Sequence, residues 1–99
     1  MAKRDAAREL AELERVFACL AHPSRRQVLL SLHLHGGTMT AGEIARRFDC
    51  TWPTTSRHLR QLEAAELVTV ETRGRERVYA VNHALLQRVV GDWLTRFDS

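Results

Sequence analysis

A chain of 99 residues is long enough for one domain with a modest core and too short for two independent domains. Its 44% hydrophobic content excludes a disordered protein, and its net charge of +3, with 14 of its 15 basic residues being arginine, favours an anionic partner. The two cysteines are too few for a disulfide framework, and no signal peptide or long apolar run is present, so we expect a cytoplasmic protein that does not enter a membrane.

The chain begins with a predicted helix over residues 5–20, whose apolar side chains step by three and four residues. That spacing makes a narrow seam, which packs either on the chain's own core or on a second copy. The seam consists of Leu10, Leu13, Phe17 and Leu20. His22-Pro23-Ser24 ends this helix, because proline is tolerated only in a helix's first turn. A second helix is predicted over residues 25–35, ended by Gly36-Gly37, with inward residues Val28, Leu29, Leu32 and Leu34.

Residues 41–65 are predicted to form a helix-turn-helix. Thr40 and Glu43 make a capping box at the start of a short helix over residues 41–48, and Asp49-Cys50 forms the turn into the next helix. Thr51 is placed to cap that helix, and Pro53 falls in its first turn, where a missing N–H costs nothing. Two helices joined by so few residues, the second basic on its outer face, are typical of proteins that insert a helix into DNA.

The stretch from Thr51 to Leu62 is the predicted DNA-binding helix. Thr55, Leu59 and Leu62 recur at spacings of four and three, so they share its inner face. The other side has no carboxylate before Glu63 and offers hydrogen-bond donors and cations, which suit the major groove. It consists of Trp52, Thr54, Arg57, His58, Arg60 and Gln61. An ordinary solvated helix face is the alternative interpretation.

A β-hairpin is predicted over residues 67–81, where the apolar period changes from that of a helix to that of a strand. Its strands are residues 67–72 and 77–81, and Gly74 supplies the positive φ of a tight turn. Arg73, Arg75 and Arg77 make the hairpin a basic projection. Asn82 then caps a last helix over residues 83–97, which is apolar on more than one face and therefore implies a partner.

The predicted fold class is mainly α with a small β-hairpin (α+β), in the order of four helices, two strands and a last helix: a winged helix-turn-helix. Over about residues 16–97 the chain resembles the ArsR-type bacterial repressors. The resemblance rests on residues 17–26 (FACLAHPSRR), 55–62 (TSRHLRQL), Leu67-Val68, and 73–75 (RGR) followed by Tyr79. It implies a homodimeric repressor that binds an inverted-repeat operator in double-stranded DNA, and one domain over residues 1–99.

The resemblance also implies the role of each part. Residues 5–20 and 83–97 are the dimerisation helices, with interface residues Leu10, Leu13, Phe17, Leu86, Val90, Trp93, Leu94 and Phe97. The fourth helix enters the major groove, and the wing (67–81) touches the backbone or the minor groove. The expected DNA-binding residues are Thr51, Trp52, Thr54, Ser56, Arg57, His58, Arg60, Arg73, Arg75 and Arg77. Trp52 and Pro53 replace the family's usual polar residues, so Trp52 packs either on thymine methyls and sugars or into the corner between helices.

The family's two familiar metal sites are absent from this sequence. The third-helix site needs paired cysteines, and the stretch from Ile44 to Phe48 has none. The four ligand positions of the last-helix site are Val81, His83, Leu94 and Phe97, of which only the histidine can bind a metal. His33 and His35 face different ways on a helix and do not share a metal. We therefore expect neither a metal nor a cofactor.

The remaining candidate residues are two cysteines and His22. Cys19 is predicted to be a small buried hydrophobe, and His22 to make a hydrogen bond at a helix end. Cys50 lies among arginines that favour a reactive thiolate, so a thiol- or redox-responsive repressor is one alternative. A winged-helix module that binds protein is another, although such a module needs no arginine-rich wing. Phosphate loops, nucleophile elbows and paired acids are missing, so we predict a sequence-specific transcriptional regulator rather than an enzyme.

Overall fold

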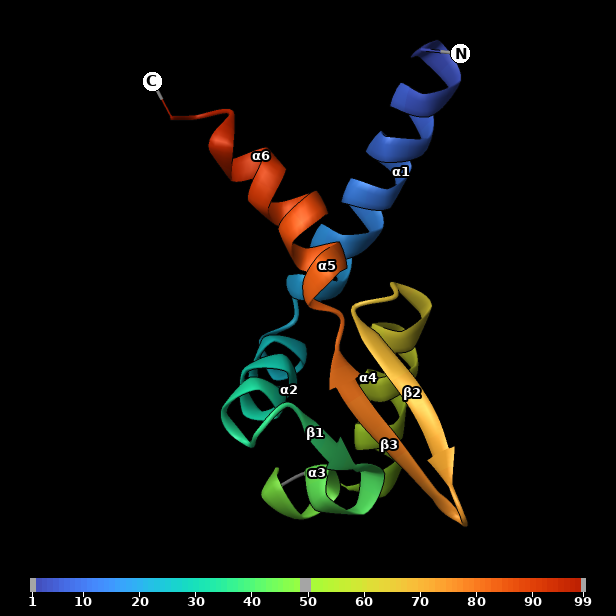
Figure 1. Cartoon of the computed structure of the whole chain (residues 1–99). Coiled ribbons are helices and arrows are strands. Elements are labelled where there is room, and N and C mark those ends of the chain that lie inside the picture. Colours follow the sequence, from blue (N-terminus) through green and yellow to red (C-terminus); the bar gives the residue numbers. More distant parts are fainter. Residues whose placement is uncertain (1, 49–50, 99) are drawn as a thin grey trace.

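The computed structural model describes residues 2–48 and 51–98. Its elements in chain order are α1 (Ala2–Leu20), α2 (Pro23–Leu34), β1 (Thr38–Thr40), α3 (Ala41–Arg47), α4 (Trp52–Ala64), β2 (Val68–Arg73), β3 (Glu76–Val81), α5 (His83–Leu86), the π-helical η1 (Gln87–Gly91) and α6 (Asp92–Thr95). In Figure 1, α2 to α4 and the strands form one body, from which α1 and α6 rise and diverge. The radius of gyration is 14.7 Å, larger than the roughly 13 Å of a compact chain of this length.

The strands form one antiparallel sheet in the order β1-β3-β2. The β2–β3 hairpin was predicted, but β1 was not, and its three residues lie between α2 and α3. β1 pairs Thr38 with Ala80, Met39 with Tyr79 and Thr40 with Val78. Because so short a strand forms only by pairing with a distant segment, no local sequence pattern predicts it.

The core lies where α1, α2, α3 and α4 meet the sheet. Its fully buried large side chains are Leu32, Ile44, Leu59, Leu62, Leu67 and Val16. The prediction for α2 was correct for Val28, Leu29 and Leu32 and wrong for Leu34, which is 68% exposed. Leu34 lies two residues beyond Leu32, and successive helical residues turn by about 100°, so its side chain points away from the core.

The predicted capping residues are confirmed. Thr40 and Glu43 exchange two hydrogen bonds, at 2.9 Å from the Thr40 amide to Oε1 and 3.1 Å from the Glu43 amide to Oγ1. The Thr51 hydroxyl accepts from the amide of Thr54 at 3.4 Å, and Asn82 Oδ1 accepts from the amide of Leu85 at 3.2 Å. Gly74 has a φ of +63° in the hairpin turn. Each helix around the DNA-binding stretch therefore begins where its capping residue indicates.

The C-terminus of α4 has a glutamate in a conformation that favours glycine. Glu66 has a φ of +61°, the one positive value for a residue other than glycine in the described part of the chain. Its amide donates to the Glu63 carbonyl at 2.9 Å, and the Leu67 amide donates to the Leu62 carbonyl at 3.0 Å. This hydrogen-bond pair is the Schellman motif, whose left-handed position is usually glycine. The left-handed backbone of a non-glycine residue costs about 1–2 kcal/mol.

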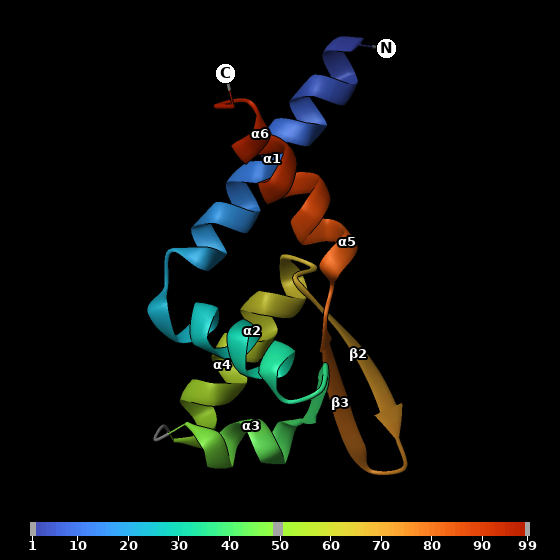
Figure 2. The same ribbon diagram turned by 60° about the vertical axis from the view of Figure 1, so that its left-hand side comes forward.

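The terminal helices differ from their predicted bounds. α1 starts at Ala2 rather than residue 5, and the last helix ends at Thr95 rather than 97 and contains the π turn η1. Figure 2 shows α1 and α6 both above the body of the protein. Both guanidinium Nη atoms of Arg88 on η1 bind the carboxylate of Glu12 on α1, at 2.5 Å and 3.0 Å. Among the described helices, none combines the length and apolar character needed to cross a bilayer.

Candidate nucleic-acid interface

The outer face of α4 is polar and basic, as predicted. Thr55, Leu59 and Leu62 are buried on its inner face. Trp52 is 53% exposed, which places its ring on the surface rather than in the corner between helices. The other surface residues of this face are Thr51, Arg57, Arg60 and Gln61, with Thr54 and Ser56 partly buried beside them.

The prediction that His58 lies on the exposed face of α4 was wrong. Its side chain is only 7% exposed, because it lies three residues after Thr55 and four before Leu62 and so shares their inner face. The ring of His22 lies 4.5 Å from its ring, and Arg25 Nε donates to its Nδ1 at 3.4 Å. The helical spacing to Thr55 and Leu62 was the signal in the sequence that placed it inside.

The pKa of His58 is lowered from its usual value, first by burial and then by the positive charges of His22, Arg25 and Arg57. Neutral His58 suits this position, since a deprotonated Nδ1 accepts the hydrogen bond from Arg25.

The prediction that His22 makes a hydrogen bond at a helix end was also wrong. It precedes α2 at the N-cap, but its side chain makes no capping hydrogen bond and instead packs on the ring of His58.

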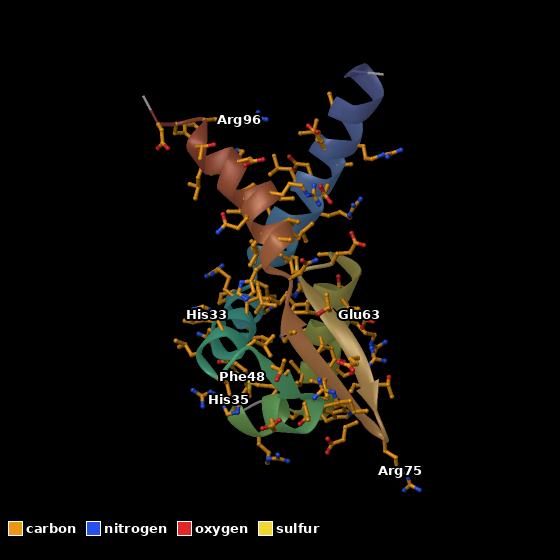
Figure 3. The ribbon with its side chains drawn as sticks, viewed as in Figure 1. His33, His35, Phe48, Glu63, Arg75 and Arg96 are labelled. Atoms are coloured by element: carbon orange, nitrogen blue, oxygen red, sulfur yellow. The ribbon has the colours of Figure 1, made fainter. Side chains whose placement is uncertain are left out.

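The three arginines of the wing, the β2–β3 hairpin, have different surroundings. Arg73 pairs with Glu71 on its own strand at 3.2 Å, and Arg77 pairs with Glu63 of α4 at 3.0 Å. Within the described residues, Arg75 has no ion pair. Figure 3 shows it at the outer end of the hairpin, pointing away from the helices. Arg75 is therefore the wing arginine best placed for an external phosphate.

The wing and α4 line the same cavity. A cavity of about 510 Å³ lies between α3, α4 and the wing. Its charged lining is mainly basic and consists of Arg46, Arg60, Arg75 and Arg77, with Glu63 and Glu76. Trp52 and Ser56 line it as well, so the outer face of α4 and the wing belong to one surface. Arg46 was not among the predicted site residues, although it lies in the last turn of α3, the first helix of the helix-turn-helix.

An apolar surface lies at the opposite end of the protein, on α1 and the last helix. Leu10, Leu94 and Phe97 are 58%, 55% and 70% exposed. The Trp93 ring lies 5.1 Å from that of Phe17 and 5.0 Å from that of Phe97, so an aromatic row connects the two helices. The other predicted interface residues, Leu13, Leu86 and Val90, are partly buried against the core.

Among the described residues, the thiol and metal candidates do not gather at one site. Cys19 is buried, as predicted, and burial raises the pKa of its thiol. Cys50 and the turn it was predicted to form with Asp49 lie outside the described residues. His33 faces His83 at 5.9 Å between ring centroids, while His35 lies 3.5 Å from Glu43. Across residues 2–48 and 51–98, no three histidine, cysteine or acidic side chains gather as a metal site would require.

A helix-turn-helix of α3 and α4, a wing beside it and a basic surface shared by both define a winged helix-turn-helix DNA-binding domain. A helix-turn-helix domain family matches residues 20–71. The chain is 35% identical over 85 residues to the transcriptional repressor SdpR of Bacillus subtilis (strain 168), covering 86% of this chain and 91% of that protein.

Solved structures show the same similarity. The crystal structure of an ArsR family transcriptional regulator is 31% identical, with a TM-score of 0.75 over 87% of this chain and 86% of that one. The homodimeric winged helix-turn-helix DNA-binding domain of a possible ArsR-family regulator from Mycobacterium bovis, 24% identical, has the same fold, with a TM-score of 0.75 over 97% of this chain and 87% of that one. This protein belongs to the ArsR family of winged helix-turn-helix transcriptional regulators, which bind DNA.

Proposed function

We propose that this protein is a homodimeric repressor that binds an inverted-repeat operator, with α4 in the major groove and the wing on the backbone or in the minor groove. The observation that carries this proposal is the cavity that α4 and the wing line together, with four arginines in its walls. A basic surface of this kind suits DNA, because the helix can enter the major groove while an exposed arginine beside it, such as Arg75, binds a phosphate. We also propose that the protein acts in the cytoplasm, where it would meet its DNA.

The proposed DNA contacts follow from exposure. Arg57 and Arg60 are exposed on the outer face of α4 and suit guanine edges or phosphates. The ring of Trp52 offers an apolar surface for thymine methyls or sugars. The full proposed set is Thr51, Trp52, Thr54, Ser56, Arg57, Arg60, Arg73 and Arg75. His58 is left out because its side chain is buried, and Arg77 is left out because it is paired with Glu63 of α4.

The proposed dimer uses α1 and the last helix. Exposed Leu10, Leu94 and Phe97 extend the aromatic row of Phe17 and Trp93, and water-exposed apolar area of this kind favours association. A second copy related by a two-fold axis would present a second α4, and the operator would mirror that symmetry. The homodimeric domain of Mycobacterium bovis named above supports the arrangement through its fold.

Selection of bound sequences from a random DNA library tests this function directly. We expect an inverted repeat whose half-site centres are about one helical turn, roughly 10 base pairs, apart or a multiple of it. The selected site should bind more weakly as salt rises, because phosphate contacts release counterions. A library that yields no enriched sequence, with binding that does not respond to salt, would contradict the proposal. A protein-binding module would behave in that way.

A further inference from the structure

The wing is joined to α4 by one ion pair. Nη2 of Arg77 on β3 donates to both carboxylate oxygens of Glu63 on α4, at 3.1 Å and 3.0 Å. The guanidinium carbon of Arg77 also lies 5.8 Å from the centroid of the Tyr79 ring, and Tyr79 is buried in the sheet. The Arg77 guanidinium therefore contacts both a carboxylate of the helix and an aromatic ring of the sheet.

No other side-chain hydrogen bond joins the outer part of the hairpin to a helix within residues 2–48 and 51–98. Arg73 pairs with Glu71 inside the same strand, and Asn82 binds the Glu66 carbonyl at the base of the hairpin. β1 supports β3 only from Val78 to Ala80. Beyond these residues the hairpin consists of two exposed strands, and the Glu63–Arg77 pair is the side-chain hydrogen bond that links them to α4.

Glu63 places a negative charge in a mainly basic surface, because it lines the same cavity as the proposed DNA contacts. A carboxylate there repels phosphates and weakens binding to any DNA sequence. Its interaction with Arg77 neutralises that arginine and fixes the span between α4 and the Arg75 tip. DNA recognition needs this span to be constant, since a phosphate contact of the wing sets the register in which the helix meets base edges.

We infer that Glu63 determines sequence specificity without touching a base: it holds Arg77 as a brace and thereby fixes the wing at one distance from α4. The inference rests on the proposed function and refines it. Arg77 is then a positioning residue rather than a phosphate ligand, and Arg75 carries the external contact of the wing. The pair itself adds little to stability, because both side chains are about half exposed, 43% for Glu63 and 51% for Arg77.

The experiment compares Glu63→Gln with Glu71→Gln by fluorescence anisotropy on the selected operator and on random DNA. Both changes remove one negative charge and release one arginine of the wing, but the Glu71–Arg73 pair lies within a single strand. We expect both variants to bind random DNA more tightly. Only Glu63→Gln should lower the ratio of operator to random affinity, by about fivefold or more, the size of a weakened base contact.

Arg77→Gln and the double variant Glu63→Gln/Arg77→Gln complete a cycle that tests the mechanism. If Glu63 acts through Arg77, Glu63→Gln should change the ratio in the wild-type background and have no further effect in the Arg77→Gln background. Arg77→Gln should leave the salt dependence of binding unchanged, whereas loss of a phosphate contact would lower the slope by about 1 per subunit. Thermal unfolding of each variant reports whether it is folded.

The outcomes separate this inference from the function on which it rests. A wild-type protein that does not distinguish its selected site from random DNA contradicts the proposed function. If the wild type does discriminate, but the ratio of operator to random affinity changes equally little in Glu63→Gln and Glu71→Gln, the inference is overturned and the proposed function stands. A lower salt slope for Arg77→Gln also overturns it, because Arg77 would then bind a phosphate.

Discussion

The imidazole rings of His22 and His58 lie 4.5 Å apart at an interplanar angle of 59°. This contact joins the segment between α1 and α2 to the inner face of α4, and Arg25 reinforces it through the hydrogen bond from Nε to His58 Nδ1. The packing of the proposed DNA-binding helix therefore depends on His58. Burial and neighbouring positive charges hold the pKa of this histidine below its usual value of 6.5.

Stability should consequently fall as pH is lowered from about 7 to 5. Unfolded His58 takes up a proton near its usual pKa of 6.5. Folded His58 takes it up only at lower pH, so in this window the unfolded state binds more protons and acid favours unfolding. His58→Gln retains an acceptor for Arg25 but does not titrate, and its free energy of unfolding should change less over this range in urea titrations. An identical pH dependence for wild type and variant would exclude His58 as a source of it.

Glu66→Gly should stabilise the protein. At a φ of +61°, glycine avoids the strain of a left-handed side-chain-bearing residue. Part of this gain is offset by the greater freedom of glycine in the unfolded chain, so we expect a net increase of about 0.5–1 kcal/mol in the free energy of unfolding. Glu66→Ala is the matched control, because it removes the same charge and keeps the strain. An equal gain in both variants, measured by calorimetry, would assign the effect to charge.

Arg57 and Arg75 should contribute to DNA binding in different ways. Arg57→Ala should cost roughly 1–3 kcal/mol on the operator and relax base preference, as expected for a residue that binds a guanine. Arg75→Ala should weaken operator and random DNA alike and lower the salt slope by about 1 per subunit, as expected for a phosphate contact. Anisotropy titrations over a range of salt concentrations distinguish the two patterns. The reverse assignment would show that the wing tip, rather than α4, recognises sequence.

Leu94→Glu should convert the dimer into folded monomers. Leu94 is 55% exposed in the single subunit, so a charge there is tolerated in the monomer but must be desolvated in the proposed interface. Leu34→Glu is the control, because Leu34 is 68% exposed on α2, away from that interface. Light scattering gives the molar mass, and circular dichroism confirms that the helices are retained. A Leu94→Glu protein that is still a dimer would place the interface elsewhere.

Operator binding should not respond to zinc, cadmium, nickel or arsenite. Val81, Leu94 and Phe97 occupy the last-helix ligand positions of the family, and a zinc site needs three or four nitrogen, sulfur or oxygen ligands. Cys19 is buried on α1 with a raised thiol pKa, which disfavours the thiolate that binds soft metals. Anisotropy with each metal, and again with a chelator, tests this. A drop of about tenfold in affinity, or 1.4 kcal/mol, that Cys50→Ser abolishes would instead assign the response to Cys50.

Much of the helix-turn-helix follows from the sequence by itself. The capping pairs at Thr40 and Glu43 and at Thr51 and Thr54 act over three residues, so their chemistry is readable locally. The spacing of Thr55, Leu59 and Leu62 identifies the inner face of α4 in the same way. Gly74 indicates the hairpin turn, because its backbone conformation is rarely open to other residues.

Tertiary structure decided what each polar side chain meets. β1 forms only when it pairs with β3, and the fold decides that the partners of the buried His58 are the His22 ring and Arg25. The sequence presents the three wing arginines alike. In the folded protein Arg73 pairs within its own strand, Arg77 pairs with α4, and Arg75 is exposed at the tip. These differences depend on where Glu71 and Glu63 lie in space. Contacts between residues distant in sequence have no local period or motif, so they emerge only when the chain has folded.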